Sequence, residues 1–233
     1  MPVSTLPEGQ TDASGRDAAA LPERDFNAAF GEMTHAVLNA LNAVTAAAEL
    51  SRLLLKRAES GEAAKTLARV EPECLRAARL LREGRAFLTF RIAARGDVAV
   101  AALLNECAER FAGRVEIMDG AELPAVRADA DALRRLFMEL LENAFAFGAN
   151  HVRVTLKETG SDALRIDVLD DGPGISVPAA RLFVPFYSTQ PDEHSGLGLA
   201  LAARIAEAHG GRVGVADCER GALFWIELPL PEA

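Results

Sequence analysis

The chain has 233 residues, half of them hydrophobic, so it can bury a core for one large domain or two modest ones. Its net charge of −9 argues against general nucleic-acid binding, which needs clustered cations to replace the counterions of phosphates. No apolar run is long enough to cross a bilayer, no signal-peptide pattern opens the chain, and its three cysteines are too widely spaced for a disulfide or metal framework, so we expect a cytoplasmic protein without a membrane partner.

The N-terminal part predicts a tail followed by a helical hairpin. Residues 1–24 lack periodicity and predict a disordered tail. Apolar residues recur every three or four positions over 26–48 and again over 64–88, which predicts two long helices, with a turn at 59–61. Because two helices alone bury little surface, we expect residues 25–95 to pair with a second copy in a dimeric four-helix bundle.

The remaining residues, 96–233, predict an α+β sandwich with helices on one face of a sheet. Asp129 is placed to cap the most periodic helix of this domain. The predicted helices are 98–112, 130–144 and 199–208, and the predicted strands are 115–117, 151–157, 164–170, 212–216 and 223–228. The chain shows no internal repeat.

Two short motifs in this domain favour a nucleotide pocket. Asp170 ends an apolar strand and is followed by Gly172 and Gly174, while Gly196-Leu197-Gly198 opens a helix. A carboxylate can accept hydrogen bonds from the adenine amino group, and glycines at a helix start let backbone N–H groups reach phosphates. Either motif alone is more often a plain turn or cap, so the prediction depends on their occurring together.

Two further features bear on this pocket. Glu139 and Asn143 are four residues apart and share a helix face, where their oxygen atoms suit Mg²⁺; alternatively, they form a solvated flank. Residues 176–195 have little periodicity but contain Phe183 and Phe186. Such aromatic residues either latch a mobile lid or simply anchor the loop.

In this order, the motifs resemble the ATP-binding domain of bacterial sensor histidine kinases. That domain belongs to a superfamily that also includes gyrase, a heat-shock chaperone and mismatch-repair ATPases. The resemblance covers roughly residues 96 to 230. It implies that Asn143 ligates Mg²⁺, that Asp170 binds adenine and that Glu139 occupies a polar or general-base position. It further places Gly172 and Gly174 against the nucleotide, Phe183 and Phe186 in the lid, and Gly196, Leu197 and Gly198 at the phosphates.

The chain departs from the family pattern at three positions near the phosphates. Ala146 and Gln190 stand where many relatives carry cationic residues, and His194 replaces a glycine. Each lost charge-assisted hydrogen bond weakens ATP binding by about tenfold or more. Arg181 either compensates for this loss or is an ordinary surface charge.

His35 is the candidate phosphoacceptor. Its helical phase lies roughly 160° from the apolar stripe, so the imidazole, a good nucleophile near neutral pH, should face solvent. Asn39, one turn later, can hydrogen-bond the ring or a phosphoryl oxygen. Residues 34–41 resemble the kinases' phosphoacceptor box, except that Ala36 and Ala40 replace the usual acidic residue and proline.

These observations predict a homodimeric histidine kinase that uses ATP and Mg²⁺, phosphorylates His35 and passes the phosphoryl group to the receiver domain of a response regulator. A docked regulator would cover the solvent-facing side of the first helix. Ala36, Ala146 and Gln190 favour an alternative, a degenerate kinase that acts as a nucleotide-binding or protein-binding scaffold. A third interpretation is a protein serine kinase or ATPase of the same superfamily, in which His35 is incidental.

Overall fold

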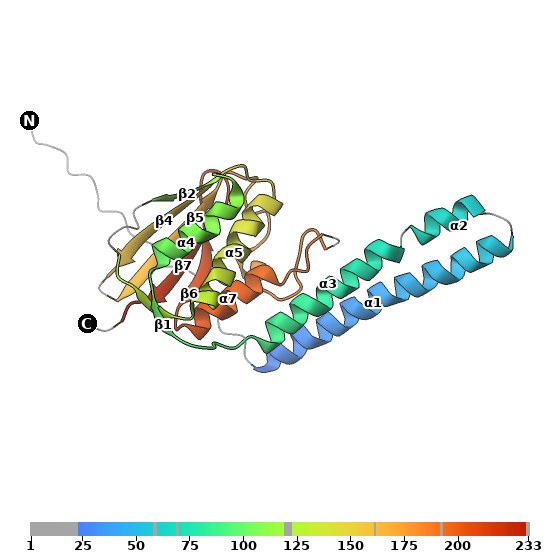
Figure 1. Ribbon diagram of the computed structural model, residues 1–233, viewed down its shortest axis with the longest axis horizontal. Coiled ribbons are helices and arrows are strands. Elements are labelled where there is room, and N and C mark those ends of the chain that lie inside the picture. Colours follow the sequence, from blue (N-terminus) through green and yellow to red (C-terminus); the bar gives the residue numbers. More distant parts are fainter. Residues whose placement is uncertain are drawn as a thin grey trace, which may run out of the picture.

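The protein was analysed as a computed structural model that describes residues 23–57, 60–68, 70–118, 123–160, 162–191 and 193–231. Most of the predicted tail, residues 1–24, lies outside this set. A long helical hairpin projects from an α/β domain, and the two parts touch where the hairpin's open end meets the domain (Figure 1). The hairpin and the sandwich expected from the sequence are therefore both confirmed.

The hairpin consists of three helices: α1 (Glu23–Lys56), α2 (Ser60–Leu67) and α3 (Val70–Thr89). Helix α1 runs along both α2 and α3 (Figure 1). The prediction of one continuous second helix is wrong, because the helix is interrupted between α2, which ends at Leu67, and α3, which begins at Val70. Pro72 explains the break, since it has no N–H and its ring would collide with the carbonyl of Ala68 in an unbroken helix. The predicted turn at 59–61 is also partly wrong, because Ser60 already begins α2.

The α/β domain contains seven strands and four α-helices within the described residues. Its helical elements are α4 (Val100–Ala108), the 3₁₀ helix η1 (Glu109–Phe111), α5 (Ala130–Ala146), α6 (Ala179–Leu182) and α7 (Gly198–Ala208). Its strands are β1 (Gly96–Val98), β2 (Val115–Met118), β3 (Val126–Ala128), β4 (Val152–Thr159), β5 (Ala163–Asp170), β6 (Arg212–Ala216) and β7 (Leu223–Pro229).

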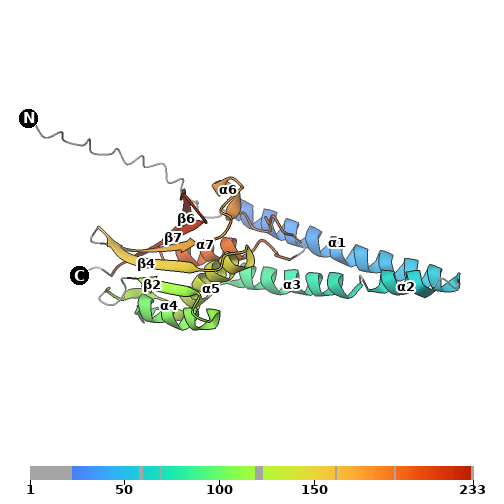
Figure 2. The same ribbon diagram turned by 90° about the horizontal axis from the view of Figure 1, so that it is seen from above.

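Five strands form the main sheet in the order β2-β4-β5-β7-β6, and helices α4, α5 and α7 cover one of its faces (Figure 2). Strand β2 is parallel to β4, and the other neighbouring pairs are antiparallel. Strands β1 and β3 form a separate two-stranded sheet. The core lies between the main sheet and the helices, where Ile166, Ile226 and Leu136 are completely buried.

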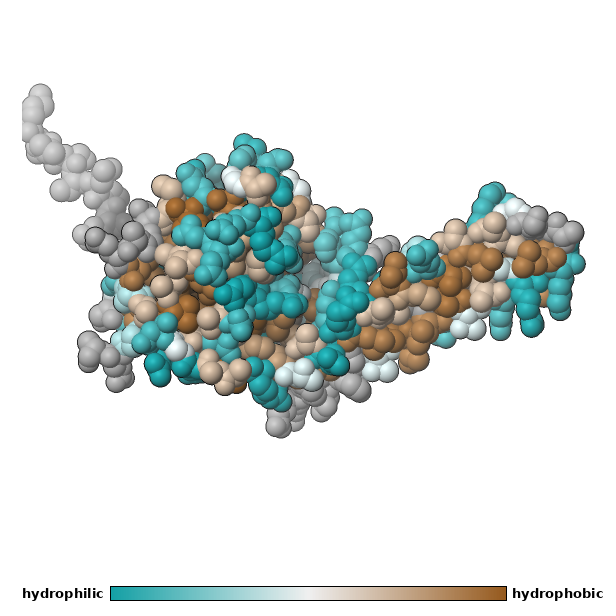
Figure 3. All heavy atoms as spheres, in the orientation of Figure 1, coloured by the Kyte–Doolittle hydropathy of each residue, from teal (hydrophilic) through white to brown (hydrophobic). Residues whose placement is uncertain are grey.

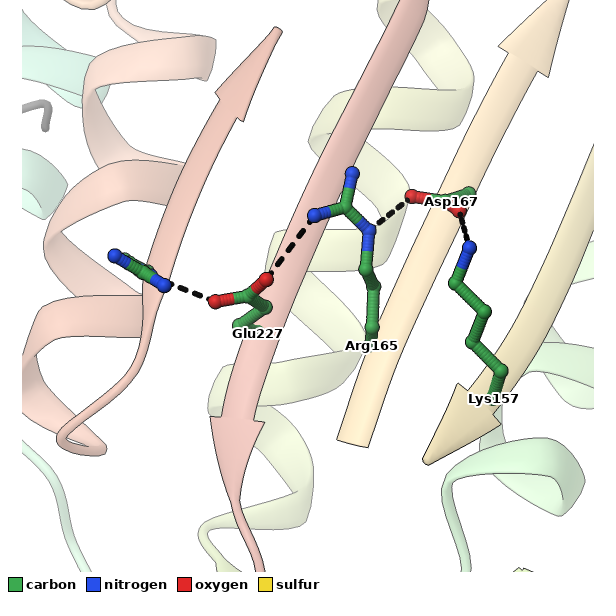
Figure 4. Close-up of polar contacts among 5 residues, drawn as sticks. Lys157, Arg165, Asp167 and Glu227 are labelled. Carbon is green, nitrogen blue, oxygen red and sulfur yellow. Dashed lines mark hydrogen bonds and ion pairs between the residues drawn. The ribbon is translucent and has the colours of Figure 1, made fainter. Parts of the chain in front are cut away.

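The opposite face of the sheet carries a line of ion pairs that crosses four strands (Figure 4). Arg165 is central: its Nε lies 2.7 Å from Asp167 and its Nη1 lies 3.0 Å from Glu227. Lys157 pairs with Asp167 at 2.9 Å, and Arg212 pairs with Glu227 at 2.7 Å. We call these five residues the charge ladder. Arg165 also lies over the Trp225 ring, so this face buries aliphatic and aromatic surface beneath charged groups.

The predicted elements of the domain agree with the structure except at short segments. The helix predicted over 98–112 is wrong at both ends, since Val98 belongs to β1 and α4 ends at Ala108. Elements β1, β3 and α6, each of three or four residues, were not predicted, whereas the equally short β2 was predicted at 115–117. The expected cap is confirmed: the Asp129 carboxylate accepts hydrogen bonds of 3.1 Å from the N–H groups of Asp131 and Ala132.

The hairpin joins the α/β domain through Phe87, which is buried in the domain's core, and through hydrogen bonds of two arginines. Arg204 of α7 donates a 2.5 Å hydrogen bond to the carbonyl of Phe87 near the end of α3, and its guanidinium lies over the Phe87 ring. About two helical turns before Phe87, Arg79 of α3 donates a hydrogen bond to the carbonyl of Glu193 in the segment before α7. Among the described helices, none combines the length and apolarity needed to span a membrane.

Candidate functional site

A cavity of about 360 Å³ lies where α3 approaches the α/β domain. Its walls come from α3, α5, the turn after β5, residues 182–196 and the start of α7. The volume is within the range of small-molecule sites. Seven residues singled out from the sequence line it: Glu139, Asn143, Asp170, Gly174, Gly196, Leu197 and Gly198.

Asp170 is the buried carboxylate of this cavity, with 8% of its surface exposed at the end of β5. Its Oδ1 atom accepts hydrogen bonds from the N–H of Gly172 at 2.9 Å and of Ala222 at 3.1 Å. These two bonds fix the plane of the carboxyl group. The other oxygen, Oδ2, is a second acceptor of this cavity-lining carboxylate.

Glycine is required at the turn after Asp170 and just before α7. Gly174 has φ +83°, and a Cβ atom there would lie 2.9 Å from the carbonyl oxygen of Gly221. At Gly196, just before α7, φ is +73° and a Cβ atom would lie 2.5 Å from the carbonyl oxygen of Tyr187. The chain therefore keeps two cavity walls free of side chains, which lets a ligand approach the backbone.

Glu139 of α5 is a second acid of the site, and it is partly buried. Its side chain is 16% exposed, and its Oε1 lies 2.6 Å from Nε of Arg135, one turn earlier. Burial raises the pKa of Glu139 from its ordinary value, and the nearby Arg135 charge partly opposes this increase. Asn143, half-buried one turn further along, lines the same cavity. The two oxygen-bearing side chains thus share one wall, as the sequence predicted.

The segment over the cavity is anchored by its phenylalanines. Phe183 and Phe186 pack against the core, and neither lines the cavity. The N–H of Phe186 donates a 3.0 Å hydrogen bond to the carbonyl of Gly196, and Phe186 has φ +62°. Of the two roles considered for these residues, the contacts favour anchoring. Gly172 also stays outside the lining, and its place is in the turn that binds Asp170.

Several cavity residues were not predicted from the sequence. The sequence could have predicted Arg135 as a partner of Glu139, because it stands four residues before Glu139 on the same helix face. His194 appeared only as a departure from the family pattern, yet its ring stacks on Phe147 with centroids 5.2 Å apart. Arg79 and Glu83 line the cavity from α3, and nothing local in the sequence indicates this placement.

The cavity does not include the candidate phosphoacceptor. His35 and Asn39 lie on α1, and both are exposed, which agrees with the helical phase of His35. Neither is among the described residues that line the cavity. The sequence-predicted residues therefore form two groups, one around the cavity and one on the hairpin surface.

The sequence of the C-terminal domain is that of a known family. Residues 128–232 match the family described as histidine kinase-, DNA gyrase B-, and HSP90-like ATPase. Over 112 residues, 46% of this chain, the protein is 38% identical to the sensor histidine kinase ZraS of Escherichia coli O157:H7 and covers 24% of that protein. It is 28% identical over 219 residues to the sensory histidine kinase/phosphatase NtrB of Rhodobacter capsulatus, covering 85% of this chain and 60% of NtrB. The chain thus spans only part of these relatives.

Solved structures of two kinases resemble most of the chain. Full-length ShkA in complex with AMPPNP is 26% identical with a TM-score of 0.57, covering 92% of this chain and 47% of ShkA. The histidine kinase ThkA in complex with its response regulator TrrA shares the fold, with a TM-score of 0.65 at 22% identity, covering 89% of this chain and 64% of ThkA. Residues 128–232 therefore belong to the histidine kinase-, DNA gyrase B-, and HSP90-like ATPase family, and most of the chain resembles sensor histidine kinases.

Proposed function

We propose that the protein is an ATP-dependent kinase that phosphorylates its own His35 and passes the phosphoryl group to an aspartate on the receiver domain of a response regulator. The observation that carries the proposal is the cavity lined by Asp170, Gly174, Glu139 and Asn143 in a chain whose C-terminal domain belongs to this ATPase family. AMPPNP bound to ShkA and TrrA bound to ThkA support the choice of nucleotide and partner.

In this proposal, Asp170 recognises the base and the start of α7 binds the phosphates. The Oδ2 atom of Asp170 accepts a hydrogen bond from the adenine amino group. The backbone N–H groups at Gly196 and Gly198 face the phosphate chain, where a helix N-terminus favours negative charge. Gly174 admits the base because no side chain projects there.

A donor group on α5 fits a magnesium ion. The amide oxygen of Asn143 is a hard oxygen donor on the cavity wall, of the kind that Mg²⁺ prefers when most of its shell comes from phosphates and water. When bound, the ion would neutralise charge on the phosphate oxygens. We assign Asn143 as its protein ligand and Glu139 as the general base.

The transfer step uses the exposed imidazole of His35. A ring nitrogen attacks the γ-phosphorus, the bond to the β–γ bridging oxygen breaks, and ADP leaves with that electron pair. Glu139 accepts the proton released from the ring, and Asn39 holds the ring or a phosphoryl oxygen. Because His35 is outside the cavity lining, the α/β domain must move along the hairpin, or a partner's hairpin must present its own His35.

The test is phosphorylation of the full chain with Mg·ATP labelled at the γ-phosphate. We expect wild type to acquire an acid-labile label, His35→Gln to acquire none, and Asp170→Asn to lose most of it through weaker ATP binding. His151→Gln, which removes another exposed histidine, is the matched control and should label normally. Wild type that stays unlabelled, or His35→Gln that labels normally, contradicts the proposal.

The same experiment separates the alternative functions. Ala36 replaces the usual acidic residue, and Ala146 and Gln190 replace the usual cations. These replacements favour a degenerate kinase, which would bind ATP without acquiring label. An acid-stable label that survives His35→Gln would instead indicate a serine kinase of the same superfamily. Label that moves from the wild-type protein to an added receiver domain would support the second transfer.

A further inference from the structure

The helical hairpin contributes directly to the cavity. Arg79 and Glu83 are four residues apart on α3, which places them on one helix face, and both line the cavity. The guanidinium of Arg79 also donates to the carbonyl of Glu193, in the segment that closes the cavity before α7. A residue of the hairpin is thus already seated among the residues proposed to bind the nucleotide.

The charge of the lining makes such a cation necessary for a polyanionic ligand. Five carboxylates line the cavity within the described part of the chain, against two arginines: Glu83, Glu139, Glu142, Asp170 and Glu193, with Arg79 and Arg135. Arg135 is held on Glu139 at 2.6 Å. Ala146 and Gln190 supply no cation where many kinases do. Nucleotide phosphates therefore need positive charge from elsewhere in addition to a metal ion.

The contact that Arg79 makes places it at the phosphate end of the cavity. Glu193 precedes Gly196 by three residues, and the Gly196–Gly198 segment starts α7 and carries the N–H groups proposed for the phosphates. Asp170, proposed for the base, is the last residue of β5 and lines a different part of the cavity. A guanidinium has five donors in a planar fork that suits phosphate oxygens.

We propose that Arg79 of the hairpin is a phosphate-binding residue that completes the nucleotide site of the α/β domain, so that bound ATP bridges the two parts of the chain. This inference rests on the proposed function, because it assigns a residue of the same site. It also accounts for the missing cations at Ala146 and Gln190, which Arg79 replaces from a different element.

The experiment measures dissociation constants of ATP, ADP and adenosine for the full chain by calorimetry. We expect Arg79→Ala to weaken ATP by roughly tenfold or more, ADP by less, and adenosine by under twofold. Arg79→Lys should recover part of the ATP affinity, since it keeps the charge but loses the fork. Arg82→Ala is the matched control, because Arg82 is exposed on the same helix and does not line the cavity.

The outcomes separate this inference from the proposed function. Wild type that binds neither ATP nor adenosine contradicts the proposed function itself. Wild type that binds ATP, with Arg79→Ala binding equally well, overturns only the role of Arg79. Equal weakening of ATP and adenosine also overturns it, because a merely structural role would affect both ligands alike. If Arg79→Ala fails to fold, the ATP-to-adenosine affinity ratio of Arg79→Lys decides.

Discussion

The carboxylate of Glu139 is both partly buried and held by one ion pair, which makes it costly to the fold and useful to the chemistry. Burial favours its protonated form, and the raised pKa increases its basicity when it is ionised. Asp170 solves the same problem differently, because two backbone N–H groups hold its carboxylate. The two acids of one cavity are thus suited to different tasks, proton acceptance and base recognition.

Replacing Glu139 with glutamine should stabilise the fold while removing activity. A raised pKa means that the folded state binds the proton more tightly than the unfolded chain, so the free energy of unfolding falls as pH rises through that pKa. We expect Glu139→Gln to melt above wild type at pH 8, with the difference shrinking below about pH 4, where both side chains are neutral. Labelling should fall by about 10² to 10⁴-fold.

Thermal melts across this pH range and labelling rates check both parts. Glu49→Gln is the control, because Glu49 is exposed on α1 and does not line the cavity, and it should shift stability by less than about 0.5 kcal/mol. A wild type that becomes more stable than Glu139→Gln as pH rises would contradict the assigned direction of the pKa shift.

At the scale of single residues, the sequence identified those whose role is local. Asp170, Gly174 and Gly198 are recognisable because a strand end, a tight turn and a helix start each leave a short signature. Arg79 left no such signature, since its role depends on the contact of α3 with Glu193, which lies 114 residues further along the chain. Phe183 and Phe186 could be placed in the right segment, but only their packing distinguishes an anchor from a latch.

At the scale of elements, the link between β6 and β7 holds Asp170 in place at the cavity. Gly221 has φ +79°, and a Cβ atom there would lie 1.7 Å from the carbonyl oxygen of Asp170. The next residue, Ala222, donates the hydrogen bond that orients the Asp170 carboxylate. A substitution in this loop therefore reaches the site without contacting a ligand.

Gly221→Ala should destabilise the protein by about 2–5 kcal/mol, because the backbone must move away from both the strained φ and the clash. Gly31→Ala is the contrasting change, because Gly31 lies inside α1 with nothing within 4 Å of its Cβ position. Alanine there should raise the free energy of unfolding by about 0.5–1 kcal/mol. Urea denaturation measures both, and equal effects of the two substitutions would contradict the crowding argument.

Elements with long periodic patterns were predictable, and most short ones were not. Strands β4 and β5 and helix α5 lie within two residues of their expected bounds, because alternation or a helical stripe extends over several turns or residue pairs. The break between α2 and α3 was missed because the apolar stripe continues across it. The sequence indicates the interruption only through Pro72, whose ring would collide with the carbonyl of Ala68 in a continuous helix.

At the scale of the whole molecule, apolar surface extends along the hairpin, whereas polar residues dominate much of the domain face seen in Figure 3. Eight leucines of the hairpin are between 47% and 63% exposed: Leu38, Leu41, Leu50, Leu53, Leu55, Leu67, Leu75 and Leu81. An apolar surface of this extent is typical of an interface. It supports the proposed homodimer, in which two hairpins form a four-helix bundle.

The double variant Leu53→Glu with Leu75→Glu should convert the proposed dimer to a monomer, because it places charges from α1 and α3 in the apolar interface. Light scattering after size exclusion measures the mass. Met118→Glu, which changes an exposed apolar residue of β2 instead, is the control and should leave the dimer intact. A wild type of monomer mass at every concentration contradicts the proposed assembly.

The relative placement of the two parts was beyond the reach of the sequence. Each amphipathic pattern tells which face an element buries, but the contact of Arg204 with Phe87 joins two elements through one guanidinium and one carbonyl. Such a contact depends on tertiary position and leaves no period. The cavity shared by α3 and α5 follows from that placement and was for the same reason not predicted.

The charge ladder also restricts how the strands can pair. In the observed register, Arg165 stands opposite Glu227 and Asp167 stands opposite Trp225. A slip of one residue would turn these charges into the core, and a slip of two in one direction would set Asp167 against Glu227, two like charges. The charges on the outer surface of the sheet therefore favour the observed register of β5, the strand that ends at Asp170, with β7.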